Sequence, residues 1–111
     1  MKKEDRIKSK IEFDNFIKKN KSVKNDFFVV HFSLKKKDNS RFGIAVGTKV
    51  GNSVIRNKFK RRIKEIIKEE RNLFKNDLDY IIIVRKKCIE IGYKEMKEKL
   101  IKLINMVNEN E

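Results

Sequence analysis

Residues 49–64 read KVGNSVIRNKFKRRIK, a stretch with seven Lys or Arg side chains and no carboxylate. It opens on the turn sequence Gly51-Asn52-Ser53, where Asn52 or Ser53 can cap a helix by accepting a hydrogen bond from a free backbone N–H group. We therefore predict a helix that begins at this turn and ends near Arg71. The rest of the chain is expected to pack around that helix.

The predicted helix has one apolar side. Apolar residues recur at three- and four-residue steps and so form a single stripe: Ile55, Phe59, Ile63, Ile66 and Ile67. At about 100° per residue, the opposite side carries Asn57, Arg61, Lys64 and Lys68, and the flanks carry Arg56, Lys58, Lys60 and Arg62. The helix can therefore bury one side while the other side stays crowded with cations.

These cations repel one another. Like charges at i,i+4, such as Arg56 and Lys60, each disfavour a helix by about 0.2–0.5 kcal/mol, and the first carboxylate to follow is that of Glu65. A helix shaped by stability alone would carry carboxylates among the cations. A polyanionic partner would relieve the repulsion; a merely solvated cationic face is the alternative.

The composition of the whole chain agrees with a polyanionic partner. Its 111 residues include 30 Lys+Arg against 16 Asp+Glu, a formal net charge of +14, which predicts attraction to nucleic acid or to an anionic membrane. A membrane is less favoured, because the longest apolar run, residues 81–84, is far too short to span one and residues 1–3 do not begin a signal peptide. The single cysteine, Cys88, excludes an internal disulfide and a cysteine-rich metal site. We expect a cytoplasmic protein with one domain, residues 1–111, of which 1–7 are flexible.

The residue pattern predicts the element order α-β-β-α-β-α, with room for a short extra strand near Ser22. The elements are a helix over 8–20, a connector to 25, strands over 27–34 and 41–46 joined by a hairpin loop at 35–40, the basic helix, a strand over 80–85 and a helix over 93–107. Because a long helix leads into strand 80–85, that strand is expected to lie parallel to a neighbour, buried on both faces. The predicted fold class is α+β, an α/β sandwich with a small mixed sheet.

Apolar side chains outside the basic helix supply a second candidate surface. The first helix carries Ile11, Phe13, Phe16 and Ile17 at its apolar positions. Strand 27–34 is apolar on both faces, with Phe28, Val30 and Phe32 on one and Phe27, Val29 and His31 on the other. Either both faces are covered or one is open for a ligand. Rings in this region could stack on unpaired bases, although a small core also needs its phenylalanines.

The chain offers little for catalysis. His31 is the only histidine and has no acidic or cysteine neighbour in the sequence, so we interpret it as a core or groove residue. Asp77 and Asp79 introduce a strand and are interpreted as turn and boundary residues. The sequence has no HExxH motif, no P-loop and no His/Cys cluster with metal-ligand spacing. We predict no catalytic and no metal-binding residue on this chain.

The spacing within the basic segment forms a motif. It runs through Lys49-Val50-Gly51-Asn52, Val54-Ile55, Arg56-Asn57-Lys58, Lys60-Arg61 and Lys64-Glu65. On this motif, and on residues 7–8, 12–13, 41–44 and 79–82, the chain resembles the protein component of bacterial ribonuclease P. Two positions depart from that family: Lys58 replaces the second arginine of Arg-Asn-Arg, and Arg62 stands where an apolar residue is common. The contacts of these two residues therefore stay open.

The resemblance implies a fold, a partner and a reaction. The fold would be a sandwich whose parallel β-α-β unit has a left-handed crossover, whereas the residues alone favour the usual right-handed one. The partner would be a large catalytic RNA, which uses Mg²⁺ held by the RNA to hydrolyse a phosphodiester and remove the 5′ leader of precursor tRNA. This chain would be the protein subunit of that endoribonuclease, with no membrane or DNA partner.

The resemblance also implies two sets of site residues. Those expected to bind the catalytic RNA are Lys49, Asn52, Arg56, Asn57, Lys58, Lys60, Arg61, Arg62, Lys64 and Lys68. Those expected to line a groove for the single-stranded leader are Phe13, Phe16, Ile17, Phe28, Val30 and Phe32. The alternative is a ribosomal-type structural RNA-binding protein, which accounts for the charge but not for the motif spacing. A protein-only nuclease would need clustered carboxylates or a histidine pair that this chain lacks.

Overall fold

The computed structural model describes residues 7, 10–19, 21–34 and 40–110. Within them the helices are α1 (Lys10–Lys19), α2 (Ser53–Glu69) and α3 (Tyr93–Asn110), and the strands are β1 (Lys21–Lys24), β2 (Phe28–Leu34), β3 (Phe42–Val46) and β4 (Leu78–Val84). Two short 3₁₀ helices, Arg71–Leu73 and Lys86–Glu90, follow α2 and β4. The predicted α+β class is confirmed.

The segment after α1 forms a strand. β1 pairs antiparallel with β2, from Lys21 opposite Phe32 to Lys24 opposite Val29, so the short strand predicted near Ser22 is confirmed and the connector predicted there is wrong. Val23 is the one residue of β1 buried in the core. The exposed lysines on this short edge strand disfavour the addition of a further strand.

The sheet order is β1-β2-β4-β3, so β4 lies between the two strands that were expected to form a hairpin. β4 is antiparallel to β2 and parallel to β3. The parallel pairing is therefore confirmed and the hairpin prediction is wrong; residues 35–39 of the expected loop lie outside the described residues. β4 takes an interior position because it is almost entirely apolar, and each of its residues except Ile83 is buried.

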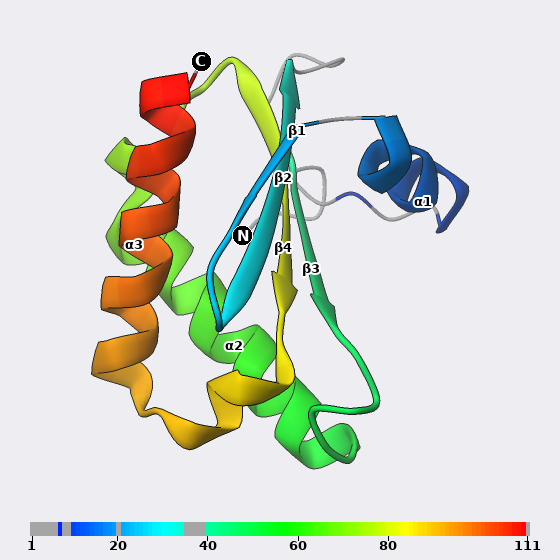
Figure 1. Cartoon of the computed structure of the whole chain (residues 1–111), viewed down its shortest axis with the longest axis vertical. Helices are drawn as coiled ribbons and strands as arrows, with labels where there is room; N and C mark the ends of the chain where they lie inside the picture. The colour runs from blue at the N-terminus through cyan, green and yellow to red at the C-terminus, as the bar shows by residue number, and fades with distance from the viewer. Residues whose placement is uncertain (1–6, 8–9, 20, 35–39, 111) are drawn as a thin grey trace.

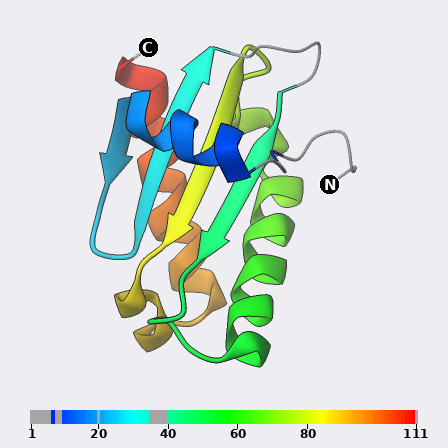
Figure 2. The ribbon, with the colours of Figure 1, turned by 90° about the vertical axis from the view of Figure 1, so that its right-hand side faces the viewer.

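The β3–α2–β4 connection is left-handed. In Figure 2 β3 (green) and β4 (yellow) both run downward, α2 lies behind the sheet, and β4 lies to the left of β3. When the unit is turned so that the helix is in front and the strands point upward, the chain passes from the right-hand strand to the left-hand strand. In nearly all such units it passes from left to right. The crossover implied by the resemblance is confirmed, and the right-handed one favoured by the residues alone is wrong.

Helices cover both faces of the sheet, with α2 and α3 on one face and α1 on the other (Figure 1). The main core lies between the sheet and the first pair of helices. It buries most of the even-numbered residues of β2, β3 and β4 against the apolar stripes of α2 and α3: Phe28, Val30, Phe32, Phe42, Tyr80, Ile82, Phe59, Ile63, Ile66, Ile67, Met96, Leu100, Leu103 and Val107. The stripe predicted for α2 is confirmed except at Ile55. That side chain is 38% exposed, because it lies in the first turn of α2 and packs on Gly51 rather than on the sheet.

A smaller core joins α1 to the other face of the sheet. Ile7, Phe16 and Ile81 are buried there, and Phe13, Ile17 and Ile83 are half-buried around them. Ile11, predicted to belong to the apolar side of this helix, is 75% exposed. At about 100° per residue, Ile11 is on the opposite side of the helix from Phe13, so both cannot face the sheet.

A buried ion-pair network fixes α1 to the sheet. Arg41, just before β3, has Nη1 2.9 Å from Glu12 Oε1 of α1 and Nη2 3.2 Å from Asp79 Oδ2 of β4. The backbone N–H of Arg41 also donates to Asp79 Oδ1 at 2.8 Å. Burial disfavours the charge on Arg41, but hydrogen bonds to Glu12 and Asp79 outweigh it and raise the pKa of the guanidinium above its ordinary value. Asp79 is therefore a buried ion-pair partner inside a strand, not the boundary residue that was predicted.

Gly43 allows α1 to approach the sheet closely. We expect Gly43→Ala to destabilise the protein by about 1–3 kcal/mol, because the added methyl would lie 2.9 Å from Phe13 Cε2 and 3.1 Å from Ile81 Cγ1. Gly47→Ala is the matched control, since an added methyl there meets nothing within 4 Å. Urea unfolding measures both variants. Equal stability of the two would show that Gly43 does not set this approach.

Candidate nucleic-acid interface

The local sequence sets where α2 begins. Asn52 has extended backbone angles, and its side-chain Oδ1 accepts a hydrogen bond from Ile55 N–H at 3.0 Å. This is the N-cap predicted from the turn sequence. The helix ends at Glu69, two residues before the predicted end, and Arg71 begins the 3₁₀ turn that follows.

The ten residues predicted to bind RNA lie on α2 or just before it, but they do not share one face. Asn57, Lys60, Arg61 and Lys64 line one hollow along the helix, together with Val54. Arg62 instead faces α3, where its Nη1 lies 3.8 Å from Met96 Sδ and its guanidinium is 5.8 Å from the centre of the Phe59 ring. The remaining five are exposed or half-buried elsewhere around the helix: Lys49, Asn52, Arg56, Lys58 and Lys68.

The cations of α2 have no carboxylate partner among the described residues. Among the residues that the structure describes, no carboxylate lies within 4.0 Å of a Lys or Arg between residues 56 and 68. Arg56 is half-buried, and its Nε is enclosed without a hydrogen-bond partner among the described residues. A buried donor left unpaired costs about 1–3 kcal/mol. A phosphate oxygen would match the charge of the guanidinium.

The carboxyl end of α2 is different, because its carboxylates pair with a lysine of α3. Lys97 Nζ lies 3.5 Å from Glu69 Oε1 and 3.4 Å from Glu70 Oε1. The Tyr93 hydroxyl donates to Glu69, and this bond together with Lys97 lowers the pKa of the Glu69 carboxyl. Five of the seven Lys and Arg residues of α2 lie between Arg56 and Arg62, so the positive charge of the helix is greatest in its first three turns.

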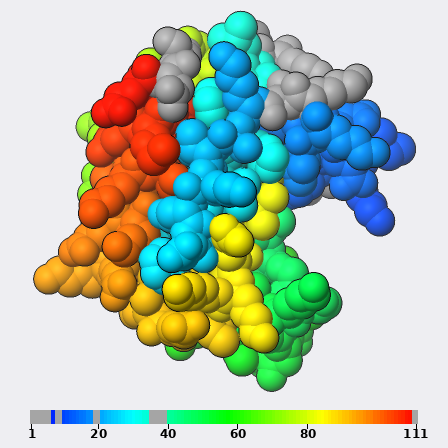
Figure 3. All heavy atoms as spheres, viewed as in Figure 1, coloured from blue at the N-terminus to red at the C-terminus, as the bar shows by residue number. Residues whose placement is uncertain are grey.

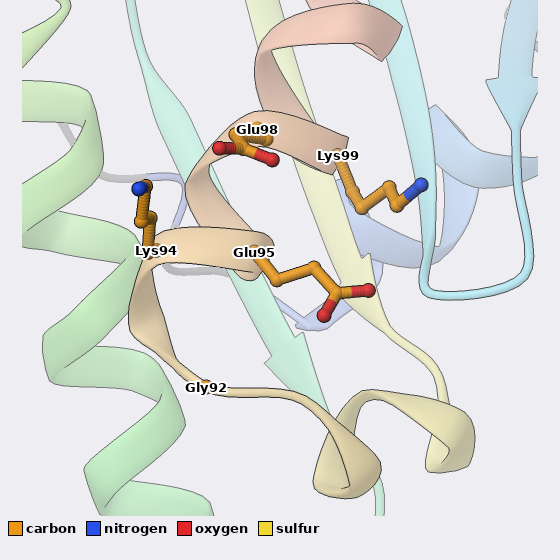
Figure 4. A pocket seen from close by; sticks show the side chains of 5 residues that line it. All are labelled: Gly92, Lys94, Glu95, Glu98 and Lys99. Carbon is orange, nitrogen blue, oxygen red and sulfur yellow. The ribbon is translucent and has the colours of Figure 1, made fainter.

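A second hollow, on α3, shows the contrast. Gly92, Lys94, Glu95, Glu98 and Lys99 line it, and Figure 4 shows that they come from the start of α3 and the turn before it. Two carboxylates and two ammonium groups lie there, and Glu95 and Lys99 are spaced i,i+4 in the favourable order. A surface with balanced charge has little attraction for a polyanion, so the hollow on α2 is the better candidate.

The sheet face under α1 is the second candidate surface. Phe13 and Ile17 of α1 are half-buried beside Ile83, and Ile83 pairs with Val29 and Ala45 in the sheet register. Paired residues share a face, so Val29 and Ala45 lie on the α1 side. Figure 3 shows the surface recessed between α1 (blue) and the green atoms at the lower right. α1 thus covers only part of this face.

The leader groove predicted from six residues is partly wrong. Phe28, Val30 and Phe32 are buried in the main core against α2 and α3, on the opposite face from α1. Phe16 is 7% exposed and serves the small core, which leaves Phe13 and Ile17 at the surface. The period-two alternation of strand 27–34 separated the two faces correctly, but the wrong face was assigned to the groove.

His31 lies on the α1 face of the sheet, opposite Ile81 in the register. It is 9% exposed, and its Nδ1 is enclosed without a hydrogen-bond partner among the described residues. Burial lowers the pKa of the imidazole below its ordinary value of 6.5, so the ring is neutral at pH 7. A neutral imidazole can stack on a base or exchange hydrogen bonds with one.

Neither metal ligation nor thiol chemistry is indicated by the described residues. They contain no group of three or more His, Cys, Asp or Glu that could hold a metal ion. Cys88 is buried, and burial raises the pKa of its thiol to about 11. No helix in the described ranges has the length and apolar character needed to cross a membrane.

The fold and this surface define a class: small basic α+β proteins with a cation-rich helix in a left-handed crossover. Among solved structures, the chain is similar to the RNase P protein of Staphylococcus aureus, with a TM-score of 0.85, 34% identity, and coverage of 93% of this chain and 94% of that one. It is also similar to the RNase P protein of Thermotoga maritima, with a TM-score of 0.81, 34% identity, and coverage of 89% and 94%.

Sequence comparisons agree with the structural ones. The family model described as Ribonuclease P matches residues 1–108. The ribonuclease P protein component of Bacillus cereus strain AH187 is 41% identical over 102 residues, covering 91% of this chain and 89% of the relative. The chain belongs to the ribonuclease P protein family. It is therefore of the kind that forms part of an endoribonuclease complex, and the family implies an RNA partner.

Proposed function

We propose that this protein binds the catalytic RNA of ribonuclease P through α2 and holds the 5′ leader of precursor tRNA on the sheet face beside α1. In this way it assists the Mg²⁺-dependent cleavage that produces the mature 5′ end of tRNA in the cytoplasm. The proposal rests on the α2 cations, which have no carboxylate partner among the described residues. Membership in the family supplies the identity of the RNA.

Contacts from α2 would go to phosphates. Lys60, Arg61 and Lys64 line one hollow, so they can hold neighbouring phosphates of one strand. Such contacts fix position and orientation but carry no sequence information. This suits a protein whose task is to dock on one large RNA and to orient a second.

Bond breaking is assigned to the RNA. The described residues offer no metal-ligand cluster, and their one histidine is a neutral, largely buried strand residue. We propose that the RNA holds the Mg²⁺, which would activate the attacking water and stabilise the leaving oxygen. The cations of this chain reduce the repulsion between the two RNAs, so that less Mg²⁺ is needed for assembly.

The leader would lie on the recessed face under α1. Phe13 offers a ring, and Ile17, Val29 and Ile83 offer apolar surface on the same face of the sheet. Stacking of bases on such side chains is worth about 1–3 kcal/mol per base and is tolerant of sequence. A groove of this composition accepts leaders of varied sequence.

The α2 interface is tested by removing two of its cations. We expect Lys60→Ala combined with Arg61→Ala to weaken binding to the catalytic RNA, and to flatten the plot of log affinity against log salt by about 0.7–0.9 per lost phosphate contact. Lys94→Ala combined with Lys102→Ala on α3 removes the same charge and should leave the slope unchanged. Filter binding across a series of KCl concentrations measures both. If the two double variants behaved alike, α2 would not be the interface.

The leader groove is tested at Phe13. Phe13→Leu keeps an apolar side chain against the sheet but removes the ring, so we expect weaker binding of precursor tRNA to the holoenzyme and unchanged binding of mature tRNA. The loss should be about 5- to 150-fold for one stacked base. Phe13→Tyr keeps the ring and should restore affinity. Equal losses for precursor and mature tRNA would show that Phe13 only supports the fold.

A further inference from the structure

Val54 occupies an unusual position on α2. It is 73% exposed, although a β-branched apolar side chain gains nothing from facing water. Single exposed apolar residues are common and need no explanation by themselves. This one, however, lines the same hollow as Asn57, Lys60, Arg61 and Lys64.

The hollow changes in chemistry along its length. Val54, Asn57, Arg61 and Lys64 follow one another at three- and four-residue steps, so they lie in one row on the outer side of the helix. The row begins with an apolar side chain, continues with an amide and ends with cations. Helical side chains lean toward the amino end, so the long cationic side chains reach back toward Val54.

This order matches the parts of a nucleotide. A base presents an apolar face and an edge of donors and acceptors, and an amide side chain carries both kinds of group. Lys60, Arg61 and Lys64 have no carboxylate partner among the described residues. The phosphates on either side of the base would supply the negative charge that matches them. The bases of an RNA duplex are stacked and paired, so only an unpaired nucleotide can present its face.

We propose that the hollow on α2 binds one unpaired nucleotide of the catalytic RNA, with its base against Val54 and Asn57 and its phosphates on the cations. This inference rests on the proposed function, because it takes the catalytic RNA as the partner. It adds a contact to a base, whereas the cations alone would recognise any phosphate backbone. α2 therefore selects a site on the RNA where the chain is single-stranded.

The test compares two exposed apolar residues. Val54→Ser should weaken binding to the catalytic RNA about tenfold, through loss of apolar contact, with no change in the salt slope. Val54→Leu should bind within twofold of the wild type. Ile11→Ser is the matched control, because Ile11 is 75% exposed on α1, away from α2, and should not alter affinity. Serine and valine have similar helix propensities, so thermal melting should show no loss of stability in Val54→Ser.

Three outcomes are distinguishable. Loss of affinity in Val54→Ser, with an unchanged slope and an unchanged melting temperature, supports the nucleotide site. Unchanged affinity, or a slope that falls as it does when Lys60 and Arg61 are removed, overturns it while leaving the phosphate contacts of the proposed function intact. A wild-type protein that fails to bind the catalytic RNA would overturn the proposed function itself, and this inference with it.

Discussion

Burial of one side of α2 is the constraint on which the rest depends. Phe59, Ile63, Ile66 and Ile67 pack against the sheet and α3, and each buried side chain contributes about 1.5–3 kcal/mol. Repulsion between like charges along the helix costs only about 0.2–0.5 kcal/mol per pair. Packing therefore prevails, and it holds the cations in a fixed direction even though they repel one another.

The other elements position this helix and determine the charge around it. β3 packs beneath it, and the ion pairs of Arg41 with Glu12 and Asp79 hold α1 on the far face. Lys97 of α3 pairs with Glu69 at the carboxyl end of α2, and five of the seven α2 cations lie between Arg56 and Arg62, so the positive charge is greatest toward the amino end. A polyanion meets its strongest attraction there, and an apolar recess lies on the other side of the sheet under α1.

The sequence allowed α2, its cap and its two sides to be predicted, because capping and helical periodicity are local. Three other features depend on how distant parts of the chain pack together, so local sequence patterns did not predict them. The place of β4 between β2 and β3 depends on which strand gains most from two neighbours, and the crossover hand depends on how the whole unit packs. The groove residues were misassigned because alternation separates the faces of β2 without saying which helix covers each. His31 and Val29 could have been found from that alternation, had α1 been placed first.

The most direct test of the central claim is cleavage of precursor tRNA by the catalytic RNA at a Mg²⁺ concentration too low for the RNA alone. We expect that adding this protein restores accurate removal of the leader, and that the protein without the RNA cleaves nothing. Absence of stimulation by a folded protein would point to a structural RNA-binding role instead. Cleavage by the protein in the absence of RNA would contradict the assignment of catalysis to the RNA.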